Sequence, residues 1–236
     1  MPRRSPIISS VITAETLVVP RGAFEMEDPW TAPAGCTPVR LRRATDAAPP
    51  RLATSVAAWF DDLHLSVLFS ASDDHVAATL LAHDAPLYSE DVVEFFFAPA
   101  EPTHYFEIEV SPRGTIFDAA IHSPEGGRAT MAVDRGWNCA DLIAAVRVVT
   151  ESDGSMTTDT LIRIPFASIR REVPKHGETW RANFFRIDRH PRHGDEFSAW
   201  QPTWKMPPDF HVPAAFGTLR FSTSAVASTG NSSDLF

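Results

Sequence analysis

Residues 87–97, LYSEDVVEFFF, mix an aromatic residue, acids and a run of phenylalanines. Written as a β-strand, the stretch places Val93, Phe95 and Phe97 on one face, because successive side chains alternate. That face is wholly apolar and predicts a core. Glu94 lies on the opposite face between apolar neighbours, which indicates a face that is partly covered or binds a ligand.

The same alternation continues in residues 104–110, HYFEIEV, where Tyr105, Glu107 and Glu109 share one side. If the two strands pair, Glu94, Tyr105 and Glu107 come together on one outer surface. This surface would be acidic, with aromatic edges. An ordinary solvated sheet face has the same pattern, so a binding surface and a solvated face both stay open.

Short alternating stretches recur along the chain with turn residues between them. They are residues 63–69, 142–149, 160–164, 181–187 and 216–221. This pattern predicts an all-β fold, an antiparallel β-sandwich that is jelly-roll-like. Only residues 166–173, FASIRREV, look helical, over about two turns. We expect one domain over residues 11–222, with flexible ends at 1–10 and 223–236.

Composition and charge bear on the partners of the chain. A net charge of −9 over 236 residues argues against nucleic acid and anionic membranes, since both attract Lys and Arg. No apolar run typical of a signal peptide or a membrane span occurs in the sequence. Cys36 and Cys139 match no zinc or redox spacing. We therefore expect a cytoplasmic chain, or a secreted one if a leader has been removed.

A series of motifs covers the chain from around Trp30 to Phe221. In order they are WFDDLHLSVLFSASDD, LYSEDVVEFFFAP, YFEIEVSPRGTIFDA, RGWN, IRIPFASI, WRANFFRID, SAWQPTW and FHVPAAFGTLRF. This order resembles that of family 9 carbohydrate-binding modules and their single-domain relatives. The resemblance implies a non-catalytic β-sandwich that holds sugars between aromatic rings. It also implies a role beside glycoside hydrolysis, in systems that degrade cellulose and plant cell walls.

The resemblance further implies which residues contact the sugar. The family's first aromatic ring stands six residues before the glutamate of a D-x-V-E motif, and these positions are Tyr88 and Glu94 here. A second ring comes from the loop before the last strand, where Trp204 is favoured over Phe210. Glu107 joins this set if its strand pairs with that of Glu94. Two departures are that Tyr88 replaces the family's typical tryptophan and that its sugar-binding arginine has no evident counterpart.

Two other functions stay open. Lys205, Met206 and His211 share the loop of Trp204, and such side chains can bind haem, so a b-type haem electron-transfer domain is one alternative. The haem would be non-covalent because the chain lacks a CxxCH motif. The other alternative is a structural or partner-binding sandwich that has lost its sugar site.

Catalysis by this chain is not expected. The sequence has no nucleophile elbow, phosphate loop or zinc-protease motif. Asp91 and Glu94 are three residues apart on a strand and would lie on opposite faces, so they cannot flank one glycosidic bond. Glu94 and Glu107 could share a face, but carboxylates on an open face rarely have the shifted pKa values that catalysis needs.

No cofactor is expected either, although the resembled family can hold structural calcium. Candidate oxygen ligands near turns are Asp73, Asp74, Asp91 and Asp118. No loop has a calcium-binding spacing, so solvated turn acids are the favoured interpretation.

Overall fold

β6 (Val92–Ala98) lies in the middle of the larger of two sheets in a computed structural model that describes residues 14–223. The sheet runs β1 (Thr16–Pro20), β14 (Gly217–Ser222), β12 (Thr179–His190), β6, β7 (His104–Val110), β8 (Ile116–His122) and β9 (Ala132–Asp134). At its side, β13 (Gly194–Ala199) pairs with β12, and β3 (Arg42–Arg43) pairs with β13. Of the predicted flexible ends, all residues but Thr223 lie outside the described range.

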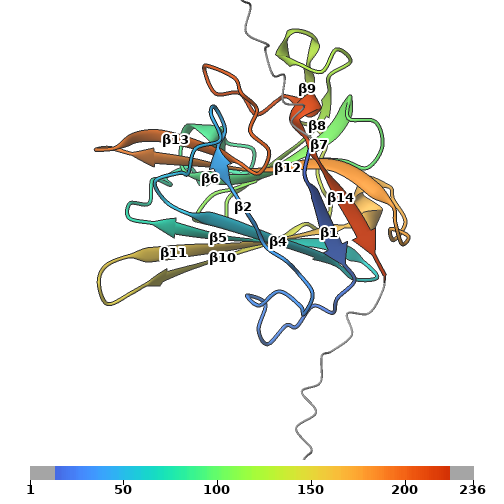
Figure 1. Cartoon of the computed structure of the whole chain (residues 1–236), viewed down its shortest axis with the longest axis horizontal. Coiled ribbons are helices and arrows are strands. Elements are labelled where there is room, and N and C mark those ends of the chain that lie inside the picture. The colour runs from blue at the N-terminus through green and yellow to red at the C-terminus, as the bar shows by residue number, and fades with distance from the viewer. Residues whose placement is uncertain (1–13, 224–236) are drawn as a thin grey trace, which may run out of the picture.

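The second sheet lies against one face of the first, and Figure 1 shows the two as stacked layers. Its order is β10 (Ile143–Thr150), β11 (Met156–Pro165), β5 (His64–Asp73), β4 (Thr54–Phe60) and β2 (Val39–Arg40). Neighbouring strands are antiparallel, except that β1 pairs with β14 in parallel. The predicted β-sandwich is thus confirmed.

The apolar face of β6 forms the core between the sheets, as its alternation predicts. Phe95 and Phe97 are fully buried and stack on each other with ring centroids 4.7 Å apart. Phe95 also stacks on Phe184 of β12, and Phe184 meets Phe69 of the second sheet edge-on at 6.0 Å. These aromatic contacts join the two layers.

The predicted helix is shorter than expected. η3 is a 3₁₀ turn over Phe166–Ile169 only. Arg170 has φ +53°, in the left-handed region, and the Arg171 N–H returns to the Phe166 carbonyl at 2.9 Å, which closes the turn as a helix C-cap does. Pro174 follows and disfavours helical backbone at the residue before it. Within residues 14–223, no helix is long and apolar enough to cross a membrane.

The outer face of the larger sheet is covered by the segment that connects β13 to β14. Figure 1 shows this orange-red segment above β6 and β12, on the side away from the second sheet. Phe210 of the segment stacks on Phe185 of β12 with ring centroids 4.2 Å apart. Glu94, on this face, is only 2% exposed. The face is therefore covered rather than solvated, and the cover leaves a cleft beside Glu94.

Candidate functional site

A cleft of about 330 Å³ opens on the covered face of the larger sheet. Three buried glutamates, Glu94, Glu107 and Glu109, come from the adjacent strands β6 and β7 and form its floor. Aromatic and apolar side chains form the walls, and three arginines lie at the exposed rim. These wall and rim residues include Tyr88, Phe117, Phe197 and Phe210, and Arg128, Arg135 and Arg189.

Strand register brings the glutamates together. Glu94 lies opposite Glu109, and Glu107 lies opposite Phe96, the residue two positions after Glu94 on the same face. One carboxylate oxygen from each of the three glutamates lies within 4.8 Å of the others. Each of the three residues is at most 5% exposed. The Oε1 of Glu94 and the Oε2 of Glu109 are buried without a hydrogen-bond partner.

Burial sets the protonation of this floor. It raises the pKa of Glu107 to about 7. It also raises the pKa of Glu94 well above its usual range, and the charge of Glu107 adds to that shift. The pKa of Glu109 is raised by burial and then by the charges of Glu94 and Glu107. Near neutral pH the floor therefore binds protons that exposed glutamates would have released.

A histidine and a tyrosine close one side of the floor. The Tyr105 hydroxyl lies 2.8 Å from Nδ1 of His211, and Nε2 of His211 lies 3.8 Å from Oε1 of Glu107. Burial lowers the pKa of His211 to about 4, and the Arg128 charge adds to this effect. The imidazole is thus neutral at pH 7 and does not offset the charge of the glutamates. The neutral ring has one N–H, and its Nδ1 shares a hydrogen bond with the Tyr105 hydroxyl.

Other groups hold the rim arginines. Arg128 pairs with Asp209 at 2.8 Å. Arg189 pairs with Asp195 and donates to the Tyr88 carbonyl at 2.6 Å, which fixes the 3₁₀ turn η1 (Leu87–Ser89) beside the cleft. The guanidinium of Arg135 lies over the Phe117 ring, 5.4 Å from its centroid. Within residues 14–223, no Arg or Lys forms an ion pair with the three glutamates.

Four of the five predicted contact residues line this cleft. Glu94 and Glu107 lie in its floor, Tyr88 is half exposed at its mouth, and Phe210 is 6% exposed in its wall. Trp204 lies outside the cleft and is half exposed.

Several cleft residues were not among the predicted contacts: Glu109, Arg128, Arg135, Arg189 and His211. The register of Glu109 opposite Glu94 could have revealed that residue. The others come from loops and strand ends far apart in the sequence, and no local pattern points to them. Of the residues considered for haem, only His211 lines the cleft, whereas Lys205 and Met206 are exposed outside it.

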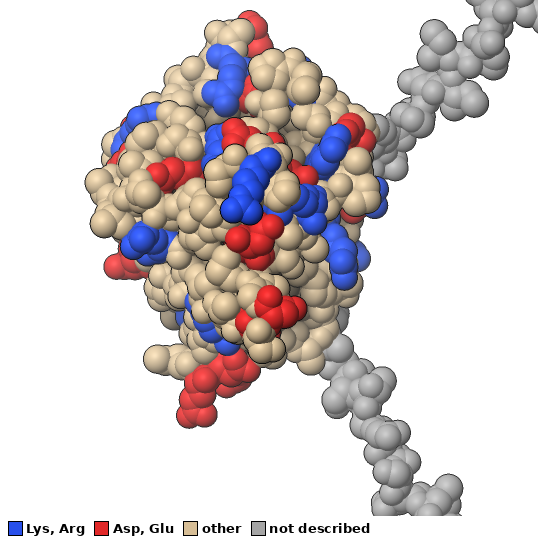
Figure 2. Space-filling model, turned by 90° about the vertical axis from the view of Figure 1, so that its left-hand side faces the viewer, with Lys and Arg blue, Asp and Glu red and all other residues tan. Residues whose placement is uncertain are grey.

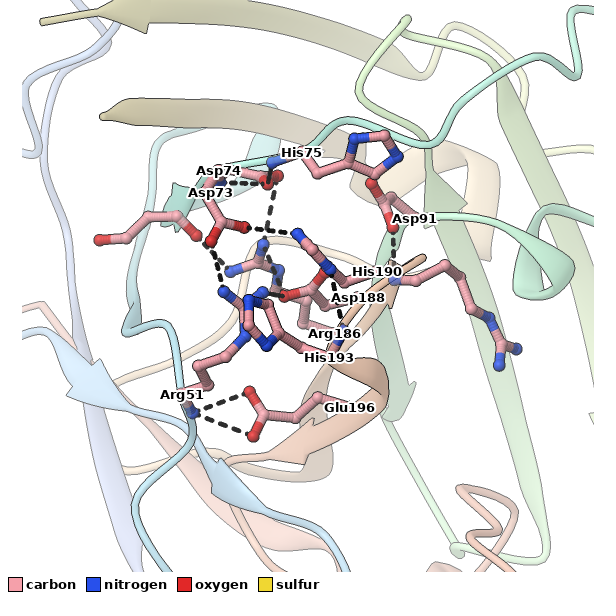
Figure 3. Close-up of polar contacts among 12 residues, drawn as sticks. Arg51, Asp73, Asp74, His75, Asp91, Arg186, Asp188, His190, His193 and Glu196 are labelled. Carbon is pink, nitrogen blue, oxygen red and sulfur yellow. Dashed lines mark hydrogen bonds and ion pairs between the residues drawn. The ribbon is translucent and has the colours of Figure 1, made fainter. Parts of the chain in front are cut away.

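The acids considered for calcium lie at two separate places. Asp73, Asp74 and Asp91 gather with arginines and histidines where β5 and β12 end, as Figure 3 shows. On the side of the molecule drawn in Figure 2, acidic and basic side chains are interspersed. Asp118 lies elsewhere, and its Oδ1 is 3.4 Å from Nε2 of His83.

Comparison with known proteins gives one curated relative and several solved structures. An "Extracellular protein" of Arthroderma benhamiae is 26% identical over 179 residues, covering 71% of this chain and 78% of that protein. A candidate carbohydrate-binding protein of Bacteroides uniformis has a TM-score of 0.67 at 17% identity, over 89% of this chain and all of that one. A family 9 module of Caldicellulosiruptor kristjanssonii in complex with cellotriose has a TM-score of 0.56 at 14% identity, over 91% and 97% of the two chains. The solved structures support the fold.

The extracellular relative contradicts the cytoplasmic location expected from the sequence, and that expectation is wrong. It rested on the lack of a signal-like apolar run near the start of the chain. A chain whose leader has been cleaved gives the same pattern, so this absence could not decide the location.

The family comparison agrees with the sandwich and with the motif order. Residues 49–221 match "Carbohydrate-binding family 9". This match spans most of the described chain, including the cleft residues and every strand from β4 onward, although β1, β2 and β3 lie before it. Family 9 modules are a non-catalytic type of domain that binds carbohydrate, as expected here, and nothing in the comparisons supports the haem alternative. The chain belongs to carbohydrate-binding family 9.

Proposed function

We propose that the cleft beside Glu94 is where this module binds its carbohydrate ligand. One observation carries the proposal: buried carboxylates with unpartnered oxygens lie beside an exposed tyrosine ring in a single cleft. A pyranose has an apolar C–H face that packs on an aromatic ring, and hydroxyls around its edge that donate to carboxylates. Tyr88 supplies the ring at the mouth, and Glu94 and Glu107 supply the acceptors.

The ligand we propose is a short β-glucan segment, a xylan-type unit or a simple sugar. Family 9 modules of Caldicellulosiruptor kristjanssonii have been solved with cellotriose and with glucose, which supports this class. The cleft volume of about 330 Å³ is at the lower end of ligand pockets, so few sugar units would be enclosed. Such binding would serve glycoside hydrolysis and carbohydrate catabolism by holding a partner enzyme near its substrate.

Tyr88→Ala and Trp204→Ala test where the ligand binds. We expect Tyr88→Ala to weaken binding of glucose or cello-oligosaccharides by about 1–3 kcal/mol, because a stacking ring is lost. Trp204→Ala removes a ring of similar exposure outside the cleft and should leave the affinity close to that of the wild type. Isothermal titration calorimetry measures both. Strong loss in Trp204→Ala with full affinity in Tyr88→Ala would move the site to the loop of Trp204.

We also propose that the acid cluster in Figure 3 holds no structural calcium. The Oδ1 of Asp73 accepts the N–H groups of Asp74 and His75, and its Oδ2 lies 3.3 Å from Nη2 of Arg186. Asp91 accepts the N–H groups of Ala77 and Arg189 at 2.6 Å each. A guanidinium thus supplies the positive charge that calcium would bring.

Chelation tests this second proposal. Melting curves recorded with and without EDTA should have midpoints within about 1 °C of each other, since no bound metal would be removed. Magnesium added back in excess serves as the control for ionic effects. A midpoint that falls by several degrees in EDTA and recovers with calcium but not with magnesium would contradict the proposal.

A further inference from the structure

The cleft floor gathers three carboxyl groups at one place, although a neutral sugar does not need a carboxylate charge for its hydroxyls to be accepted. Glu94, Glu107 and Glu109 are each at least 95% buried, and one oxygen of each lies within 4.8 Å of the others. Two of their oxygens have no hydrogen-bond partner. The nearest basic side chain that faces them is His211, which is neutral at pH 7. Buried charges are normally paired, and because no cation is paired with these glutamates in residues 14–223, protons neutralise them instead.

The rim arginines do not fill that role. Arg128 and Arg189 are engaged by Asp209 and Asp195, and Arg135 lies over an aromatic ring. Their charges still act on the floor, since Arg128 and Arg189 both lower the pKa of Glu94. This effect is smaller than that of burial, which is the leading cause of the shift and raises the pKa. Without a bound cation the floor therefore keeps protons, and it carries its full negative charge only when a cation is bound.

From this cluster we infer that the cleft selects a sugar that carries a protonated amine, such as a 2-amino-2-deoxyhexose unit. The inference rests on the proposed function, because it names the ligand class of the same cleft. An ammonium group offers three N–H donors and one positive charge, which matches three converging carboxylate oxygens. The tyrosine at the mouth is suited to the pyranose face of the same molecule.

Calorimetric titration with three monosaccharides of the same ring tests the inference. Glucosamine, glucose and N-acetylglucosamine are compared at about pH 6.5, where such an amine is protonated. We expect glucosamine to bind about tenfold or more tightly than the other two, as charged hydrogen bonds are stronger than neutral ones. N-acetylglucosamine matters because it keeps the nitrogen but removes the charge. Glucuronic acid is the opposite control and should bind most weakly.

The outcomes separate the two proposals. If glucose binds as tightly as glucosamine and Tyr88→Ala removes the binding of both sugars, the amine preference is overturned. The carbohydrate site itself is then still supported. Tighter binding of glucuronic acid would also overturn it, in favour of the rim arginines as the selective groups. If none of the sugars nor their short oligomers bind, the proposed site itself is wrong and the preference is rejected with it.

A variant pair shows whether the glutamates cause the preference. Glu109→Gln should reduce the affinity ratio of glucosamine to glucose by about tenfold, because an amide replaces one of the carboxyl groups that can lose a proton and pair with the ammonium. Glu27→Gln makes the same change at an exposed position outside the cleft and should keep the wild-type ratio. Melting curves confirm that both variants fold. An unchanged ratio in Glu109→Gln would overturn the inference.

The pH dependence of glucosamine affinity is a further test, because glutamates with a purely structural role would not produce one. Glucosamine affinity should rise by about tenfold between about pH 5 and pH 6.5, because Glu107, whose pKa is about 7, becomes increasingly deprotonated over this interval. Glucose affinity should lack this rise. Tyr105, His211 and the rim charges face the same floor. Tyr105 and His211 do not change charge over most of this interval, because the pKa of His211 is about 4 and burial raises the pKa of Tyr105. A flat glucosamine profile would contradict the inference.

Discussion

Arg186→Met should lower the free energy of unfolding by about 3–5 kcal/mol, the usual cost of removing one partner from a buried ion pair. Arg186 is 5% exposed, and its Nη2 lies 3.3 Å from Oδ2 of Asp73 and 3.7 Å from Oδ2 of Asp188. Its Nη1 donates to the Ser72 carbonyl at 2.7 Å and to Thr54 at 3.3 Å. Methionine has similar length but leaves the buried Asp73 without its cation, whereas Asp188 keeps Arg51 at 3.1 Å (Figure 3).

Urea denaturation monitored by tryptophan fluorescence measures this loss. Arg43→Met is the matched control, because Arg43 forms an exposed pair with Asp46 and its removal should have a far smaller effect. Adding Asp73→Asn to Arg186→Met should recover part of the lost stability, since it removes the carboxylate that Arg186→Met leaves without a cation. A double variant whose loss equals the sum of the single losses would show that the ion pair is not what stabilises this region.

Glu107→Gln should have the opposite effect and stabilise the fold by about 3 kcal/mol near pH 7. The pKa of Glu107 is about 7 in the folded state, against 4.5 for an ordinary glutamate. A carboxyl whose folded pKa is raised contributes most stability below its unfolded pKa and loses it as pH rises through the folded value, at ~1.4 kcal/mol per pH unit. Glutamine does not titrate, so the gain should appear above about pH 4.5, grow toward pH 7 and then level off.

Denaturation of both proteins at several pH values provides the test. His211 works in the other direction, because its pKa of about 4 makes the fold less stable as pH falls below the usual histidine range. It is present in both proteins, so the difference between them reports mainly on Glu107. A stability difference that is the same at every pH would rule out the buried charge as its cause. A more stable variant with weaker sugar binding would show that the floor trades stability for function.

Strand alternation predicted the part of the site that lies on regular structure. The period of two placed Glu94 and Glu107 on one face, and the register of β6 with β7 brings their carboxylates together. The same rule divided the core from the outer face of β6. Glu109 was not among the predicted contacts, because alternation gives its face but not the register between the strands. Only the register sets Glu109 opposite Glu94.

The cover of the outer face could not be predicted in the same way. It depends on Phe210 stacking on Phe185, two residues that are distant in sequence and share no pattern. The neighbouring prolines correctly predicted that Trp204 lies outside the strands. A stiff loop does not reveal which way the Trp204 ring points. Its backbone has φ +59°, and its N–H bonds to the Ala44 carbonyl, which leaves the ring half exposed beyond the cleft.

The parallel pairing of β1 with β14 has a mechanical consequence. The pair joins the first and last described strands in register from Thr16 opposite Thr218 to Pro20 opposite Ser222. A pulling force between the two outer ends of these strands acts along the pair in opposite directions. Such a force shears all of the interstrand hydrogen bonds at once instead of opening them one after another. The module should therefore resist stretching along a tethered chain better than a sandwich whose terminal strands are antiparallel neighbours.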